Sequence, residues 1–279
     1  MLSFVTWKIN PVAFTFPFIK IHWYGITFAT GFIIGEWIIK KIWRQEKLDM
    51  VWFDKLFLYV VISTIIGARL GHCLFYNPSY YLFHPFEITK IWRGGLASHG
   101  GTIGIIIAVW VYSKKITHRS MLWTFDRLVV PIGFVAALIR LGNLMNHEIY
   151  GYPTNVPWAF RFVKNFPVRN VNPIFTPPSH PTQLYEAFFY VLTACMCLWM
   201  YWKREDHKYP GLIFGVFLIG IFLSRFFIEF YKNVQEPFEK HMLLNMGQLL
   251  SIPFIIAGMW FTYKGLKLKN SLSKSLYKE

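Results

Sequence analysis

This chain contains seven apolar stretches, and a helix formed by each would be about as long as a lipid bilayer is thick. They lie at 23–39, 52–72, 95–112, 121–142, 182–202, 211–231 and 243–263. A helix needs about 20 mostly apolar residues to cross the hydrocarbon core of a membrane. The stretches therefore predict an all-α integral membrane protein with about seven transmembrane helices.

The composition supports a membrane protein and excludes several other classes. Of the 279 residues, 54% are hydrophobic, 20% aromatic and only 15% charged, whereas soluble domains carry about a quarter charged residues. Three cysteines cannot build a disulfide framework, and no Cys/His spacing fits a zinc site. We therefore expect no metal and no cofactor. The net charge of +15 is scattered between apolar blocks, which favours membrane lipids as partners over nucleic acid.

The distribution of basic residues predicts how the chain crosses the membrane. Segments 40–51, 113–120, 203–210 and 264–279 hold 15 Lys and Arg in 44 positions, whereas 1–22, 73–94, 143–181 and 232–242 hold 9 in 94 positions. The segments richer in basic residues normally face the cytoplasm. We therefore expect an extracytoplasmic N-terminus and a cytoplasmic C-terminus. The first twenty residues lack a basic region, so we expect the first span to remain as an uncleaved anchor.

The longest segment between spans, 143–181, lies between the fourth and the fifth. It is rich in Pro and Asn and also contains aromatic residues such as Trp158. We expect a single polytopic membrane domain over 1–279, with 143–181 inserted as a small irregular extracytoplasmic cap.

Polar side chains gather at one end of all seven spans, the predicted outer end. They are Tyr24, Arg69, His72, His99, Arg140, Asn143, His180, Gln183, Glu186, Arg225, Glu229 and Gln248. Ionisable groups inside a membrane are costly and are often functional. Unrelated structural groups would be spread over both ends, so this bias predicts one polar chamber that opens outward.

Several of these residues also have a purely structural interpretation. Arg225 and Glu229 are spaced i,i+4 and could form an ion pair within one helix. Arg140 could extend its guanidinium to the interface only to anchor its helix. Tyr24 could belong to an aromatic belt, and Arg69, with glycines on both sides, could serve helix packing. These alternatives stay open at the level of the sequence.

Two patterns indicate chemistry at the outer end. His99 lies in a glycine-rich segment, 94–104, that allows a ligand or another backbone to approach closely. A neutral imidazole there could accept a proton from a thiol or alcohol, although a structural histidine is the alternative. Arg140 and Arg225 suit a phosphate, because guanidinium stays charged and forms bidentate contacts with phosphate oxygens. The residues alone thus predict a protein that handles a phospholipid or another anionic substrate at the outer leaflet.

One segment carries a resemblance to a known family. Residues 140–151 read Arg-Leu-Gly-Asn-Leu-Met-Asn-His-Glu-Ile-Tyr-Gly, which resembles the signature Gly-Arg-x-Gly-Asn-Phe-x-Asn-x-Glu-x-x-Gly of the prolipoprotein diacylglyceryl transferases. The chain departs from it at Ile139 and Leu144. Five further blocks resemble the family in the same order; they are Tyr24-Gly25, Gly-Gly-x-x-x-His-Gly-Gly ending at Gly101, His-Pro-Thr-Gln-Leu-Tyr-Glu from His180, Arg-Phe-Phe-Ile-Glu-Phe from Arg225 and Met-Gly-Gln-Leu-Leu-Ser from Met246.

The resemblance implies a reaction and its substrates. Members move the sn-1,2-diacylglyceryl group of phosphatidylglycerol to the lipobox cysteine thiol in the signal peptide of a prolipoprotein. A thioether forms and sn-glycerol 1-phosphate leaves, as the first step of bacterial lipoprotein maturation. No cofactor is implied.

The resemblance also assigns roles to residues of this chain. Arg140, Arg225 and His99 are the expected catalytic residues, the arginines for the phosphate and His99 as base for the thiol. The expected phosphatidylglycerol-binding residues are Tyr24, Arg140, Asn143, Asn146, Glu148, Gly151, Arg225 and Glu229.

Two other classes of protein remain as alternatives. A transporter or channel for an anionic solute could line its path with the same arginines, but it would need polar groups in the inner half too and often has repeated halves. A non-catalytic lipid-binding scaffold would leave His99 and its glycines without a purpose. The one-sided polar set and the absence of a repeat favour the transferase.

Overall fold

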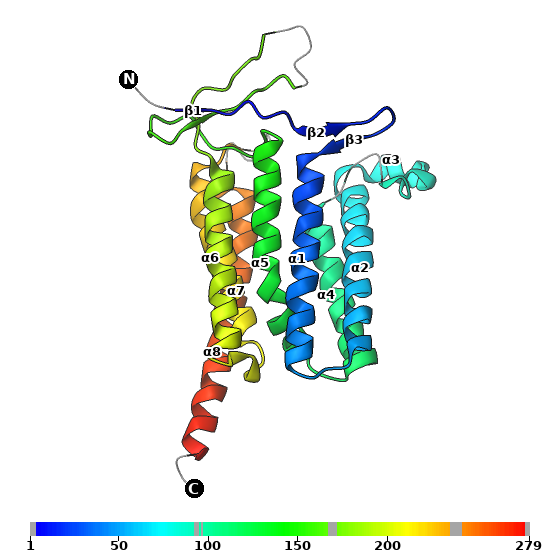
Figure 1. Ribbon diagram of the computed structural model, residues 1–279, viewed down its shortest axis with the longest axis vertical. Coiled ribbons are helices and arrows are strands. Elements are labelled where there is room, and N and C mark those ends of the chain that lie inside the picture. The colour runs from blue at the N-terminus through cyan, green and yellow to red at the C-terminus, as the bar shows by residue number, and fades with distance from the viewer. Residues whose placement is uncertain (1–3, 92–94, 96, 167–171, 235–241, 277–279) are drawn as a thin grey trace. The chain divides into compact units, whose positions relative to one another are not determined.

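The computed structural model describes residues 4–91, 95, 97–166, 172–234 and 242–276 (Figure 1). Helices dominate the described residues. The α-helices are α1 (Trp23–Gln45), α2 (Met50–Tyr76), α3 (Pro78–Phe83), α4 (Ser98–Tyr112), α5 (Met121–Met145), α6 (Thr182–Trp202), α7 (Leu212–Ile228) and α8 (Met246–Leu276). Short helical turns are η1 (Pro85–Glu87), η3 (Ser113–Thr117), η4 (Asp206–Lys208) and η5 (Glu229–Tyr231). The strands are β1 (Val5–Thr6), β2 (Val12–Thr15), β3 (Lys20–His22) and β4 (Phe160–Arg161).

Among the described residues, five helices are long and apolar enough to cross a membrane. They are Met50–Tyr76, Met121–Met145, Thr182–Trp202, Leu212–Tyr231 and Met246–Leu272. The predicted stretches 23–39 and 95–112 form α1 and α4. Helix α4 has only 15 residues, and α1 carries four charged residues in its second half, Glu36, Lys40, Lys41 and Arg44. The chain is thus a multi-pass α-helical membrane protein with at least five candidate spans.

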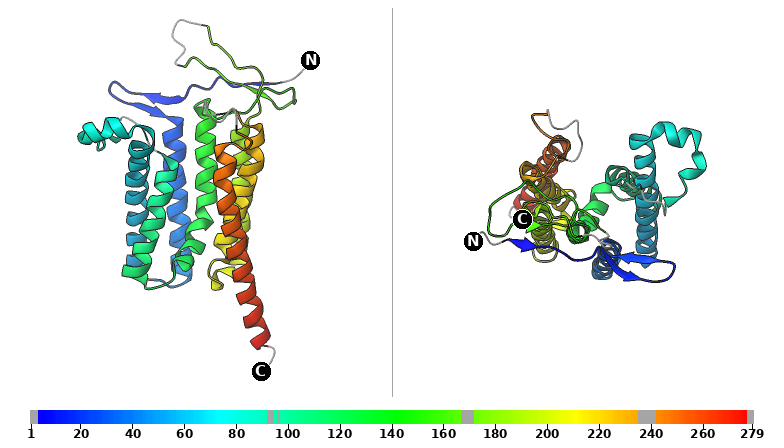
Figure 2. Two further views of the ribbon diagram at one scale, coloured as in Figure 1. Left: turned by 180° about the vertical axis from the view of Figure 1, so that it is seen from behind. Right: turned by 90° about the horizontal axis from the view of Figure 1, so that it is seen from above.

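The described chain divides into two compact units, 1–38 with 128–279 and 39–127. In the second unit, α2 and α4 lie side by side (Figures 1 and 2). Their contact is backbone against backbone, because a Cβ added at Gly100 would lie 2.2 Å from the carbonyl oxygen of Gly67. Small residues allow this close approach of helices in a membrane, where van der Waals contact replaces hydrophobic burial. The glycines around His99 therefore allow α2 and α4 to pack closely.

In the first unit, α7 packs along α8 and α6 packs on α7. The closest approaches again occur at small residues. A Cβ at Gly215 would lie 2.6 Å from the amide nitrogen of Thr262, and one at Gly133 would lie 2.9 Å from the carbonyl oxygen of Tyr190. The first contact fixes the depth of α7 against α8 and the second that of α5 against α6, which helps to position the polar residues near the helix ends.

The described part of the segment 143–181, which leaves out 167–171, contains one short strand within the irregular course that we predicted. Its strand β4 pairs in parallel with the N-terminal strand β1, with Val5 opposite Phe160, while β2 and β3 form a separate antiparallel pair. The amide of Val5 donates to the carbonyl of Ala159 at 2.8 Å, and the indole of Trp7 donates to the carbonyl of Leu144 at 3.1 Å. The prediction missed β1 and β4, because these partners lie about 150 residues apart and each strand is only two residues long.

Candidate active site

The centre of the site is a buried ion pair between α5 and α6. Arg140 lies near the C-terminal end of α5, and its Nε is 2.8 Å from Oε2 of Glu186 in the first turns of α6. The Glu186 side chain is 0% exposed and that of Arg140 is 15% exposed. The Tyr190 hydroxyl donates to Oε1 of Glu186 at 3.4 Å. An arginine that only anchored its helix at the interface would lie in water, so this burial argues against the snorkelling alternative.

The same carboxylate binds a second cation. Lys232, directly after η5, places Nζ 3.1 Å from Oε1 of Glu186 and 3.0 Å from Oε2 of Glu229. Its side chain is 2% exposed. Buried charges persist only when they are paired and hydrogen-bonded, and here the pairs form one chain from Arg140 through Glu186 and Lys232 to Glu229.

The signature residues form a hydrogen-bonded series beside Arg140. Nη1 of Arg140 donates to Oδ1 of Asn143 at 3.2 Å. The amides of Asn143 and Asn146 both donate to Oε1 of Glu148, at 2.8 and 3.2 Å. The amide of Gln183 donates to the backbone carbonyl of Glu148 at 2.5 Å. Because α5 ends at Met145, the chain can turn back there and bring Glu148 over the helix end.

Gly151 joins the signature to the segment that carries Lys232. The two residues form an antiparallel bridge, and the amide of Gly151 donates to the carbonyl of His180 at 2.8 Å. A Cβ at Gly151 would lie 2.2 Å from the carbonyl oxygen of Tyr231, so only glycine fits here. Asn233 secures the bridge by donating to the carbonyl of Gly151 at 2.7 Å. Gly151 thus positions Lys232 so that its Nζ reaches Glu186.

Tyr24 and Arg225 belong to the same unit. Tyr24, at the start of α1, packs against Gly142, where an added Cβ would lie 2.8 Å from its ring, and its hydroxyl lies within electrostatic range of Glu148 and Arg140. Arg225 forms no ion pair with Glu229 in the described part of the chain, because Glu229 pairs with Lys232. The i,i+4 alternative is therefore wrong. Nε of Arg225 is buried and has no hydrogen-bond partner among the described residues.

His147 lies at a position that the signature leaves open, yet it holds the N-terminal segment. The amide of Val163 donates to its Nδ1 at 3.2 Å, so Nε2 carries the proton and donates to the carbonyl of Ile9 at 2.8 Å. Burial lowers the pKa of His147 below its usual value. The neutral imidazole therefore connects the first residues of the chain to the segment 143–181.

His99 belongs to the second unit, in the first turn of α4. Its ring lies 5.1 Å from that of Phe75 and 6.0 Å from that of Tyr76, measured between centroids. Nε2 of His99 is buried without a hydrogen-bond partner among the described residues, which leaves a ring nitrogen available. Several neighbours of His99 in the sequence, 92–94 and 96, lie outside the described residues.

Arg69 has a structural role. Its guanidinium donates to the backbone carbonyls of Glu87 at 2.6 Å, Ile88 at 2.7 Å and Gly95 at 3.2 Å. Gly95 has φ +76, and a Cβ there would lie 2.6 Å from the ring of His72. Arg69 therefore ties Glu87, Ile88 and Gly95 to α2, and the His72 ring lies against Gly95.

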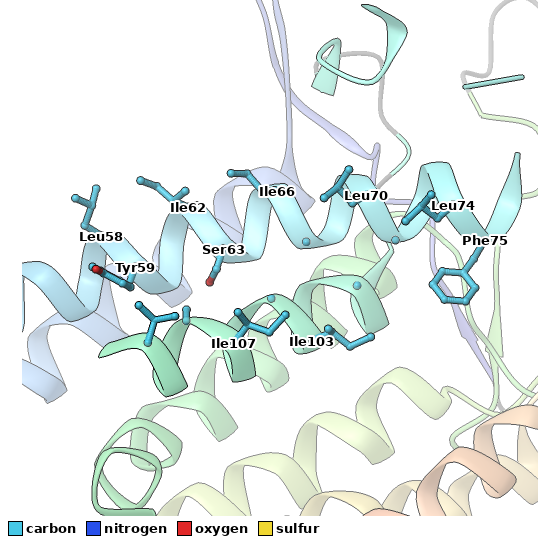
Figure 3. Close-up of a pocket in the computed structure, with 16 residues that line it drawn as sticks. Leu58, Tyr59, Ile62, Ser63, Ile66, Leu70, Leu74, Phe75, Ile103 and Ile107 are labelled. Carbon is cyan, nitrogen blue, oxygen red and sulfur yellow. The ribbon is translucent and has the colours of Figure 1, made fainter. Parts of the chain in front are cut away.

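An apolar groove runs between α2 and α4, from Leu58 to Phe75, the residue that contacts His99 (Figure 3). Its volume is about 610 Å³. Ile62, Ile66 and Leu70 from α2 and Ile103 and Ile107 from α4 contribute to its walls (Figure 3). Such a surface suits an aliphatic chain, since it offers almost no polar partner.

Most of the residues that the sequence analysis singled out lie in one unit of the structure, but the second cation, Lys232, was not among them. Tyr24, Arg140, Asn143, Asn146, Glu148, Gly151, Arg225 and Glu229 all lie in the first unit, whereas His99 lies in the second. Glu186 was noted as polar but received no role, and Lys232 was not singled out. The available signal was the spacing of Lys232, which follows Glu229 by three residues in a segment with few basic residues.

Comparisons with known proteins place the whole chain in one family. The family model for prolipoprotein diacylglyceryl transferase matches residues 11–264. A phosphatidylglycerol–prolipoprotein diacylglyceryl transferase of Porphyromonas gingivalis is 56% identical over 271 residues, which cover 95% of this chain and 96% of the relative. Proteins of the same name from Chloroherpeton thalassium and Tolumonas auensis are each 42% identical, over 95% and 91% of this chain and 96% and 94% of the relatives. The chain belongs to the prolipoprotein diacylglyceryl transferase family.

Proposed function

We propose that this protein transfers the diacylglyceryl group of phosphatidylglycerol to the lipobox cysteine of a prolipoprotein. The observation that carries the proposal is the buried pair of Arg140 and Glu186 beside the Asn143–Glu148 hydrogen bonds, all formed by blocks that resemble the family. The relatives are all named as transferases, so the alternative of an anionic-solute transporter has no support.

The reaction forms one bond and breaks one. The cysteine thiolate attacks a glyceryl carbon, the bond from that carbon to the phosphate oxygen breaks, and sn-glycerol 1-phosphate leaves with both electrons. The thiol proton goes to His99. Thiolate is the competent nucleophile, and it belongs to the substrate. The developing negative charge on the phosphate is stabilised by cations already in place, which is an efficient form of electrostatic catalysis.

Each residue of the site has a role in this proposal. Arg140 binds the phosphate of phosphatidylglycerol, and Arg225, whose Nε has no partner among the described residues, contacts the phosphate or the leaving group. Tyr24 donates a hydrogen bond to the lipid. The remaining residues hold the arginines and the head-group glycerol; they are Asn143, Asn146, Glu148, Gly151 and Glu229.

The reaction itself provides the direct test of the function. Purified protein is incubated with phosphatidylglycerol and a lipobox peptide, and the expected product is a thioether-linked diacylglyceryl peptide seen by mass spectrometry. A peptide with serine in place of the cysteine is the control and should remain unmodified. Absence of the product at saturating lipid would contradict the proposal.

The proposed topology has seven spans in the bacterial inner membrane, with the N-terminus and a 143–181 cap outside and the C-terminus in the cytoplasm. We expect a membrane-impermeant thiol reagent to label a cysteine at Asn155 in intact cells and to miss one at Asn270, in a variant without Cys73, Cys195 and Cys197. Both test positions are exposed. Labelling of position 270 instead would show that the orientation is the reverse of the proposed one.

The proposed role of His99 predicts a pH-dependent defect. A peptide thiol has a pKa of about 8.5, so at neutral pH it needs a base, whereas at high pH it ionises unaided. We expect His99→Gln to lower turnover most near pH 7 and to recover part of it above pH 9. A loss of equal size at every pH would instead assign His99 a purely structural role.

A further inference from the structure

A second polar site lies at the other end of α4 from His99. There α4 continues into η3, a π-helical turn, and the chain then enters α5 at Met121. A pocket of about 420 Å³ opens at this junction. It is lined by Trp110, Ser113, Lys114, His118, Arg119, Ser120 and Met121. All of these residues belong to the second unit.

The pocket is cationic and has no internal counter-charge. Lys114, His118 and Arg119 are exposed, and none of the residues lining the pocket is acidic. Within the described part of the chain, none of these three forms an ion pair with a carboxylate. Arg127, which lies over the ring of Trp123, is already paired with Glu46 at 2.7 Å. An anion in this pocket would therefore supply the missing charge without displacing a protein group.

Arg119 is held in place by aromatic rings instead of an acid. Its guanidinium lies over the rings of Trp123 and Trp52, 4.5 and 5.7 Å from their centroids. Tyr112 fixes this wall by donating to the carbonyl of Trp52 at 2.9 Å. A stacked guanidinium keeps its hydrogen-bond donors free at its edge, which suits the oxygens of a phosphate.

The surface beside the pocket is apolar and exposed. Ile103, Ile107 and Trp110 are spaced i, i+4 and i+7 on α4 and are 51%, 55% and 52% exposed, so they share one face of the helix. Ile103 and Ile107 also line the α2–α4 groove (Figure 3), and Trp110 lines the basic pocket. The apolar surface and the basic pocket are thus continuous along one helix.

We propose that this pocket binds the phosphate of an anionic phospholipid, with an acyl chain of the same lipid along the exposed face of α4. The continuity of the basic pocket with an exposed apolar surface favours a lipid over a soluble phosphate, which would use the pocket alone. The site lies at the end of α4 opposite His99, and none of the residues that line it has a role in the proposed reaction.

Native mass spectrometry of the detergent-solubilised protein with dioleoyl phosphatidic acid tests the proposal, because each bound lipid is counted. We expect Lys114→Glu, and more strongly the double variant Lys114→Glu/Arg119→Gln, to weaken binding of one lipid by about tenfold or more, since each removes a charge-assisted contact. Dioleoyl phosphatidylcholine should show no such difference. The single variant leaves the tryptophan contacts of Arg119 intact, so it remains informative if the double variant is unstable.

Lys115→Glu is the matched control. Lys115 is adjacent, has the same charge and is exposed, but it does not line the pocket. An equal loss of lipid in this control would overturn the proposal in favour of a general surface-charge effect, as would unchanged binding in the pocket variants. Competition by glycerol 3-phosphate at concentrations similar to the lipid would overturn the assignment to a lipid.

Discussion

Replacing Arg140 with lysine should leave the protein folded and remove most of its activity, and replacing it with alanine should remove more. Lysine keeps the charge beside Glu186 but loses the planar fork that can hold Glu186, Asn143 and a phosphate at once. Alanine also removes one electrostatic contact to the leaving phosphate. Such a loss costs on the order of 3 kcal/mol in the transition state, about a hundredfold in rate.

The measurement is turnover of phosphatidylglycerol by purified variants of equal thermal stability. Arg140→Lys separates the two possible roles, because an arginine needed only as a counter-ion to Glu186 would be replaced by lysine with little loss. Tyr190→Phe is a useful companion variant, since it removes a hydroxyl that contacts Glu186 while leaving every charge in place. Near wild-type turnover in both Arg140 variants would remove this residue from the site.

Replacing Glu186 with glutamine should be the most destabilising single change in the network. The carboxylate is 0% exposed and is the ion-pair partner of both Arg140 and Lys232. Its neutralisation removes the ion-pair partner that Arg140 has among the described residues and leaves Lys232 paired with Glu229. Breaking a buried pair in this way costs about 3–5 kcal/mol, because the remaining charge stays desolvated.

Thermal unfolding in detergent tests this expectation. Glu186→Asp keeps the charge on a shorter side chain and should have intermediate stability. Glu205→Gln is the surface control, since Glu205 and its partner Lys208 are 58% and 59% exposed and a solvated pair contributes little. If Glu186→Gln unfolds at the wild-type temperature, the buried charge network does not stabilise the protein.

The sequence predicted the class of the fold because membrane helices are specified locally. Length and apolarity of a stretch decide whether it can cross a bilayer, and five of the seven predicted stretches form helices that meet both conditions. The prediction was weaker at 95–112, where α4 is 15 residues long. There the glycines that interrupt the hydrophobic pattern are the residues that α2 and α4 need for backbone contact.

The sequence by itself therefore determined a multi-pass α-helical membrane protein, the family, and a set of polar residues near the helix ends. Only the tertiary structure decided which charges pair. Helical spacing offered Arg225 as the partner of Glu229, but Glu229 binds Lys232. Helix periodicity specifies which residues share a face of one helix. The partner of a residue across a helix interface depends instead on the relative depth and rotation of the two packed helices. Lys232 reaches Glu186, which lies 46 positions earlier in the chain, because its β-bridge with Gly151 holds it there. A buried carboxylate is stable only with such a partner.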